Sequence, residues 1–252
     1  MKKKVNTKLN INKATKKQNK YTFKNTVKGN FNSIVYDASK EIVKKLGKGC
    51  NPVFIYGKTG SGKTHFLKTI ENEIKIKIPR TKVKYISCLD FVEEFIDSIK
   101  NGRASIFKNK YRSVDALLID DIDILRGKPQ TQEEIINMFN DIYTKNKLIV
   151  FSSNLSPNRL SRYIDKRLMS RFSWGLTLEL KQLNYSDRIQ ILKNHLRNLG
   201  KRNAIDEKVI EYIAKNKKSD IRELEGAINR VLLYIRITKQ KNYANDIKRI
   251  FK

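Results

Sequence analysis

Short apolar runs alternate along this chain with longer stretches in which apolar residues recur every three or four positions. Five of the runs have the length and composition of β-strands. They are Val53–Tyr56, Lys82–Ser87, Ala116–Ile119, Leu148–Ser152 and Leu176–Leu180. Because strands that alternate with helices form parallel sheets, the pattern predicts an α/β fold with helices on both faces of the sheet.

The stretches between the strands carry helical periods. One apolar face is formed by Val92, Phe95, Ile96 and Ile99, and another by Ile135, Ile136, Phe139, Ile142 and Tyr143. The second helix is predicted to begin at Thr131, because Glu134 follows at the spacing of a capping box.

After about Tyr185 the strand pattern ends and three helical stripes remain. They are Ile189, Leu192 and Leu196, then Val209, Ile210 and Ile213, then Leu224, Ala227, Ile228, Val231, Leu232 and Ile235. Asp220, with Glu223 three residues on, is predicted to cap the third helix. We therefore predict an α/β domain over residues 21–183 and a small all-helical domain over 184–252.

Charge changes the picture, because 54 Lys and Arg residues face only 25 Asp and Glu, which gives a net charge of +29. Such a surface attracts polyanions, and nucleic acid is the leading partner class. The alternative is a Lys- and Asn-rich composition that merely forms a solvated coat. Residues 1–20 contain no acidic residue and are predicted to be a disordered basic arm that contacts DNA phosphates, or a leader with no partner.

The remaining composition indicates a cytoplasmic protein. Its two cysteines, Cys50 and Cys88, do not make a disulfide framework. No apolar run approaches the ~20 residues that span a membrane, so no membrane span is predicted. The lysine-rich N-terminus is not followed by the apolar stretch of a secretory signal.

The strongest motif is a phosphate-binding loop, which runs from Gly57 to Thr64 as GKTGSGKT. A predicted strand enters it, and a helical stripe of Phe66, Leu67, Ile70 and Ile74 follows, as this motif requires. Its glycines Gly57, Gly60 and Gly62 let backbone N–H groups face an anion, while Lys58, Thr59 and Ser61 complete the cradle. Lys63 is predicted to reach the β- and γ-phosphates of ATP, and Thr64 to coordinate Mg²⁺.

A second acidic site follows the strand Ala116–Ile119, which ends in Asp120 and Asp121. A carboxylate at a strand end beside a phosphate loop is placed to hold Mg²⁺, the role predicted for Asp120. Asp121 is predicted to polarise the attacking water. Asp123 is expected to face solvent without a role.

These stretches together resemble the DnaA family of bacterial replication initiators. The resemblance rests on Tyr21–Phe23 with Val27 and Gly29, Asn51–Gly57, Gly62–His65, Tyr111–Ile122, Arg167–Gly175 and Ile221–Arg230. It implies an AAA+ fold, a P-loop domain with a parallel sheet followed by a small helical lid. It also implies an ATP/ADP-controlled oligomerisation switch on DNA with slow ATP hydrolysis.

The resemblance further implies residue roles. Asn154 takes the sensor 1 position, where the family usually carries Asp, and His65 borders the nucleotide. Arg222 would contact the phosphates from the lid. Arg171 would act in trans on the ATP of a neighbouring subunit in a head-to-tail oligomer, with Arg167 supporting that interface. Trp174 is expected to be a buried anchor.

Single-stranded DNA is the implied partner, with Ile96 and Lys128 at the corresponding positions and duplex DNA attracted by charge alone. A plain amphipathic core helix is the alternative for the segment around Ile96. No helix pair of the duplex-reading kind is predicted after the lid. Three other functions stay open: a regulatory paralogue of the initiator, a helicase loader in contact with other replication proteins, and a passive basic DNA-coating protein.

Overall fold

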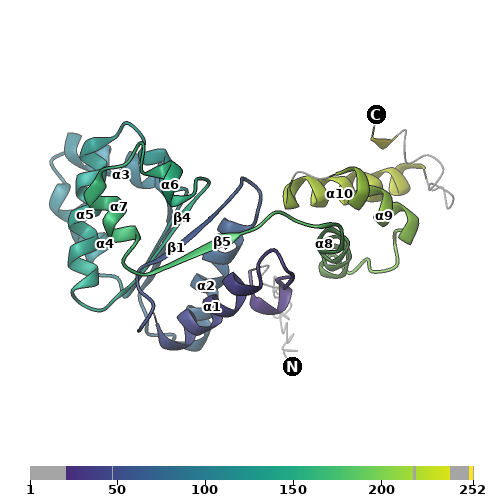
Figure 1. Cartoon of the computed structure of the whole chain (residues 1–252), viewed down its shortest axis with the longest axis horizontal. Coiled ribbons are helices and arrows are strands. Elements are labelled where there is room, and N and C mark those ends of the chain that lie inside the picture. Colours follow the sequence, from purple (N-terminus) through teal and green to yellow (C-terminus); the bar gives the residue numbers. More distant parts are fainter. Residues whose placement is uncertain (1–20, 47, 218–219, 239–249, 252) are drawn as a thin grey trace, which may run out of the picture.

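Five parallel strands form one sheet in the computed structural model of the chain, which describes residues 21–46, 48–217, 220–238 and 250–251 (Figure 1). The predicted basic arm, residues 1–20, lies outside the described residues. The strands are β1 (Val53–Gly57), β2 (Val83–Ser87), β3 (Ala116–Asp120), β4 (Leu148–Ser153) and β5 (Leu176–Leu180). All five predicted strands are confirmed, and their order in the sheet is β2-β3-β4-β1-β5.

The register brings the carboxyl ends of the strands to one edge. Val53 of β1 lies beside Val150 of β4, and Ile119 of β3 lies beside Phe151 of the same strand. Every residue of β3 and β4 is buried, as expected for central parallel strands. The segments that leave β1, β3 and β4 therefore meet at one crevice, where ligands of open α/β sheets bind.

Helices cover both faces of the sheet (Figure 1). On one face lie α1 (Ser33–Lys45) and α2 (Lys63–Lys77), whose apolar side chains share a core with alternate strand residues. The other face carries α3 (Cys88–Lys100), α4 (Ala104–Arg112), α5 (Pro129–Tyr143) and α7 (Lys166–Phe172). Three short elements complete this part: η1 (Phe23–Asn25), η2 (Ile122–Leu125) and α6 (Pro157–Leu160).

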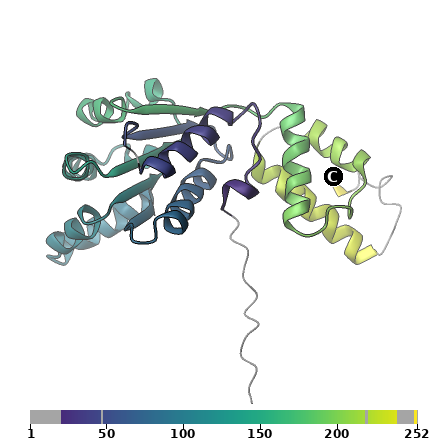
Figure 2. The same cartoon turned by 90° about the horizontal axis from the view of Figure 1, so that it is seen from below.

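The lid consists of α8 (Tyr185–Asn198), α9 (Glu207–Asn216) and α10 (Ile221–Thr238). It has its own apolar core, into which Phe31 of the N-terminal segment also packs. The predicted cap of α10 is confirmed, because the Glu223 backbone N–H donates to Asp220 Oδ1 at 2.8 Å. Figure 2 shows the N-terminal segment between the sheet domain and the lid, where Asn194 Nδ2 donates to the Asn25 carbonyl at 2.9 Å.

Three predictions about side chains are wrong. Helix α5 begins at Pro129, which fits the first helical turn, so Thr131 is a buried helical residue and not a cap. Helix α3 buries Phe91, Val92 and Phe95, whereas Ile96 and Ile99 are exposed. Trp174 is 52% exposed, because its ring lies edge-on against Phe139 at the surface.

Within the part of the chain that the structure describes, no helix has both the length and the apolar composition needed to cross a bilayer.

Candidate nucleotide-binding site

The phosphate loop connects the end of β1 at Gly57 to the start of α2 at Lys63. Gly60 and Gly62 have φ of +74° and +104°, a left-handed backbone that other residues adopt only with strain. A Cβ at Gly57 would lie 2.7 Å from the Leu180 carbonyl oxygen, so this position also requires glycine. The glycines thus allow the tight loop that turns backbone N–H groups toward an anion.

Lys63 is folded into the loop and is only 5% exposed. Its Nζ donates to the Gly57 carbonyl at 3.0 Å, to the Lys58 carbonyl at 3.2 Å and to Asn154 Oδ1 at 2.7 Å. Burial lowers the pKa of Lys63, and the charge of Asp121 opposes this effect. The ammonium group is therefore held where phosphate oxygens can replace its present carbonyl partners.

Asp120 ends β3 and is 2% exposed. Its carboxylate accepts hydrogen bonds from the Ser152 hydroxyl and, at 2.9 Å, from the Tyr85 hydroxyl. The next residue, Asp121, has φ of +58° and accepts from Asn154 Nδ2 at 3.2 Å. Burial, and then repulsion from Asp120, raises the pKa of Asp121.

The expectation that Asp123 faces solvent is wrong. Asp123 is half-buried, and its carboxylate accepts from the Asn154 backbone N–H at 2.9 Å and from the Ser153 hydroxyl at 3.2 Å. The left-handed backbone at Asp121 turns the chain back toward the end of β4, which the run Asp120–Asp123 does not reveal by itself. In the sequence, the contact of Asp123 is signalled only by its position as a third acidic residue, two residues after Asp121 at the end of a buried strand.

The residues fit a nucleotide and its cation. The Ser61 hydroxyl is buried in the loop and has no hydrogen-bond partner among the described residues, so an incoming phosphate oxygen can accept from it. Asp120 and Asp121 crowd two carboxylates that a divalent cation would relieve. In the described part of the chain no three His, Cys, Asp or Glu residues converge on one point. Mg²⁺ held by Thr64 and Asp120 would therefore complete its shell with phosphate oxygens and water.

A cavity of about 200 Å³ brings part of the predicted phosphate and catalytic set together, whereas the buried Asp120 is not among the residues that line it. Lys63, Thr64, Asp121 and Asn154 line it from the sheet domain, and Arg222 lines it from the lid. The lid lies directly against the loop here, because the Ile221 backbone N–H donates to the Gly60 carbonyl at 3.2 Å.

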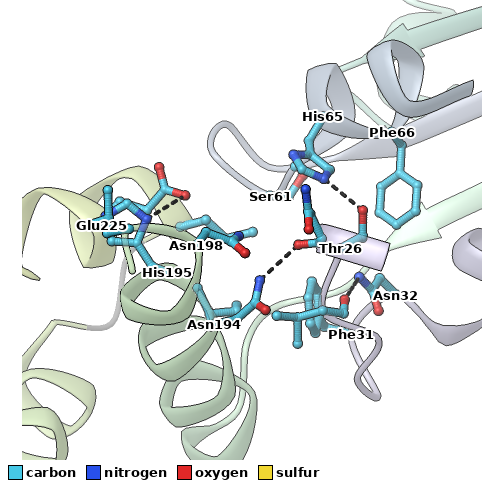
Figure 3. A pocket seen from close by; sticks show the side chains of 16 residues that line it. Thr26, Phe31, Asn32, Ser61, His65, Phe66, Asn194, His195, Asn198 and Glu225 are labelled. Atoms are coloured by element: carbon cyan, nitrogen blue, oxygen red, sulfur yellow. Dashed lines mark hydrogen bonds and ion pairs between the residues drawn. The ribbon is translucent and has the colours of Figure 1, made fainter. Parts of the chain in front are cut away.

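An adjoining cavity of about 310 Å³ lies between the N-terminal segment, the start of α2 and the lid (Figure 3). His65 borders both cavities, and its Nε2 lies 2.8 Å from the Thr26 hydroxyl. Apolar Phe31 and Ile191 line it together with the amide of Asn194. This mixture of flat apolar surface and a few polar groups suits a purine base and ribose.

Arg171 borders neither cavity. Its Nε donates to Asn140 Oδ1 at 2.9 Å, and its NH1 donates to the Arg167 carbonyl at 2.8 Å. Its guanidinium also lies 5.6 Å from the centre of the Trp174 ring. Arg167 is exposed and pairs with Glu133 at 2.6 Å. One chain therefore does not bring Arg171 to its own loop.

Comparison with known proteins decides the family. Residues 17–179 match the family model described as the bacterial DnaA ATPase domain. The chain belongs to the DnaA family. A chromosomal replication initiator protein DnaA from Methylacidiphilum infernorum is 41% identical over 221 residues, which cover 88% of this chain and 48% of that protein. The chain thus spans about half the length of the curated relatives it matches.

Solved DnaA structures agree with the fold. Domain III of the Thermotoga maritima replication initiation protein DnaA superposes with a TM-score of 0.87 at 36% identity, covering 92% of this chain and 95% of that one. A replication initiator DnaA bound to AMPPCP and single-stranded DNA superposes with a TM-score of 0.80 at 35% identity, covering 91% of this chain and 69% of that one. The AAA+ fold with a C-terminal helical part is thereby confirmed.

Proposed function

We propose that this DnaA-family chain is an ATP/ADP-controlled assembly switch that acts on DNA in replication initiation. One observation carries the proposal. A single cavity collects Lys63, Asp121 and Asn154 from the sheet domain and Arg222 from the lid, while Arg171 is held outside it. If Arg171 acts on a nucleotide, as the family resemblance implies, it would have to reach the site of a second copy, as in a head-to-tail oligomer.

Within one subunit, Lys63 would exchange its bonds to the Gly57 and Lys58 carbonyls for phosphate oxygens. Arg222 would close on the same phosphates from the lid, since a guanidinium can engage two oxygens at once. Asn154 would contact the γ-phosphate, because its side chain already forms hydrogen bonds with Lys63 and Asp121. Mg²⁺, when bound with ATP between Thr64 and Asp120, would supply charge neutralisation at the phosphates.

Hydrolysis is proposed to be slow. Asp121 is placed to orient water, but its carboxylate is one methylene shorter than the Glu that most AAA+ ATPases carry there. Its raised pKa reflects an ionised form that is already disfavoured by burial and by Asp120. A turnover well above about 1 s⁻¹, within the ordinary enzyme range, would contradict this part of the proposal.

Contact with DNA is proposed at two positions of the sheet domain, Ile96 and Lys128. Ile96 is 43% exposed on α3, so it is available to a ligand. Lys128 directly precedes α5 and is half-buried. The related initiator structure that contains AMPPCP also contains single-stranded DNA. A basic groove that tracks the phosphate backbone would give this chain the same class of partner.

Two alternative functions, regulatory paralogue and helicase loader, differ in the protein that the chain would bind. A regulatory paralogue would pair with a full-length initiator and accelerate its hydrolysis, whereas a loader would bind the replicative helicase. Pull-downs of purified chain with each partner, in ATP and in ADP, distinguish these functions from self-assembly on DNA.

The direct test is Arg171→Ala. Assembly in Mg-ATP, followed by light scattering, is expected to weaken by at least about tenfold, which corresponds to about 1.4 kcal/mol for each junction. ATP affinity of dilute subunits is expected to stay within about twofold. Arg80→Ala, which removes an exposed arginine between α2 and β2, is the matched control. Unchanged assembly of Arg171→Ala would refute the proposal.

A further inference from the structure

Gln132 is a buried amide with both of its ends in use. It lies in α5 and is 6% exposed. Its Nε2 donates to the Leu125 carbonyl at 2.9 Å, and its Oε1 accepts from the Asp165 backbone N–H at 2.8 Å. The two partners fix the orientation of the amide, because a carbonyl can only accept and an N–H can only donate.

The first partner belongs to the nucleotide site. Leu125 is the last residue of η2, the turn that follows Asp120 and Asp121. Asp123 in the same turn accepts from the Asn154 backbone, and Asn154 in turn accepts from Lys63 at 2.7 Å. A displacement of Lys63 or Asn154 by the phosphates would therefore reach η2 through two hydrogen bonds.

The second partner belongs to the helix that carries Arg171. Asp165 caps α7, where its side chain accepts from the Arg167 backbone N–H at 2.7 Å. Helix α7 has only seven residues, so its direction depends on what holds its ends. Helix α5 holds the beginning through Gln132 and the far end through the bond between Asn140 and Arg171.

We infer that Gln132 is a positioning residue that couples the nucleotide site of one subunit to the arginine that this subunit offers to the next. The inference rests on the proposed function, in which Arg171 acts in trans. It deepens that function, because it makes the placement of Arg171 depend on the ATP site of its own chain. If Gln132 had a purely structural role, its loss would instead weaken ATP binding and pairing between subunits to the same extent.

The test uses Gln132→Met, which keeps the volume and removes both hydrogen bonds. Gln130→Met is the matched control, because Gln130 lies on the same helix and is exposed. ATP affinity is measured with a fluorescent ATP analogue on dilute subunits. The ability to donate Arg171 is measured separately, as ATP-dependent pairing of a trace of labelled variant with an excess of Arg171→Ala subunits, which keep an ATP site but offer no arginine.

We expect Gln132→Met to bind ATP within about twofold of wild type and to pair with Arg171→Ala at least about fivefold more weakly, the scale of a long-range coupling. Gln130→Met should match wild type in both measurements. Equal pairing by Gln132→Met and wild type, or parallel losses of ATP affinity and pairing, would overturn the inference.

Three further results are informative. If thermal unfolding shows that Gln132→Met does not fold, Gln132→Glu takes its place. The glutamate keeps an acceptor for the Asp165 N–H, but its ionised form has no donor for the Leu125 carbonyl. The same selective loss of pairing is expected. If Arg171→Ala itself assembles like wild type, the proposed function has failed and the inference falls with it. If only Gln132→Met behaves normally, the inference alone is overturned.

Discussion

Asp121 lies where ionisation of its carboxyl group destabilises the folded protein. It is half-buried beside Asp120, in a left-handed backbone conformation, and its pKa is raised by burial and by that neighbour. A carboxyl group whose folded-state pKa is raised destabilises the folded protein when it ionises. That penalty is fully present above the folded-state pKa and disappears below the ordinary value of 3.8.

Replacement of this carboxylate is therefore expected to stabilise the nucleotide-free protein. Asp121→Asn should raise the free energy of unfolding at pH 7 by about 1 kcal/mol, the scale of relieving a conflict at a functional site. The gain over wild type should shrink as the pH falls toward 4. Hydrolysis of ATP should fall at the same time. Thermal unfolding of both proteins across this pH range checks the claim, and a gain that does not depend on pH contradicts it.

At the scale of elements, the contact between the phosphate loop and α10 sets how the lid sits. Gly60 has a left-handed backbone, and a Cβ there would lie 2.4 Å from the Asp220 side chain. The Ile221 N–H also bonds the Gly60 carbonyl. Only glycine allows the loop to come this close to Asp220. Because Arg222 directly follows Ile221, the same contact positions both the phosphate loop and this arginine of the lid.

Two glycine substitutions separate this contact from ordinary helix propensity. Gly60→Ala should destabilise the protein by at least about 1 kcal/mol, because it combines backbone strain with displacement of Asp220, and should weaken ATP binding. Gly226 lies within α10, and a Cβ added there would meet open space. Gly226→Ala should therefore raise the free energy of unfolding by about 0.5–1 kcal/mol and leave ATP binding unchanged. Chemical denaturation and ATP titration of both variants provide the measurements. Equal effects of the two would contradict the assigned role of Gly60.

The elements also show what sequence can predict. All five strands and the phosphate loop were predictable, because they depend on local apolar runs and glycine spacing. The contact between Asp123 and Asn154 was not, because it joins residues 31 positions apart through a backbone turn. Likewise, the exposure of Trp174 depends on the aromatic side chains that α5 presents to it. The predicted roles of Arg171 and Arg222 remain predictions.

At the scale of the whole molecule, a net charge of +29 makes nonspecific attraction to nucleic acid the background for any specific effect. Counterion release predicts that affinity for single-stranded DNA falls steeply with salt, with a slope of about −0.7 for each phosphate contacted. The proposed switch adds a second expectation, since affinity at a fixed salt concentration should be higher in Mg-ATP than in Mg-ADP. Fluorescence anisotropy across salt concentrations measures both, and a steep slope without a nucleotide effect would leave charge as the whole explanation.

Calorimetric titration of the folded chain with Mg-ATP addresses the central claim most directly. The site described here predicts saturable binding of one nucleotide by each chain, loss of that binding in Lys63→Ala, and weaker binding in Arg222→Ala. A chain that is folded by circular dichroism and shows no heat of binding and no thermal shift with Mg-ATP would contradict the account.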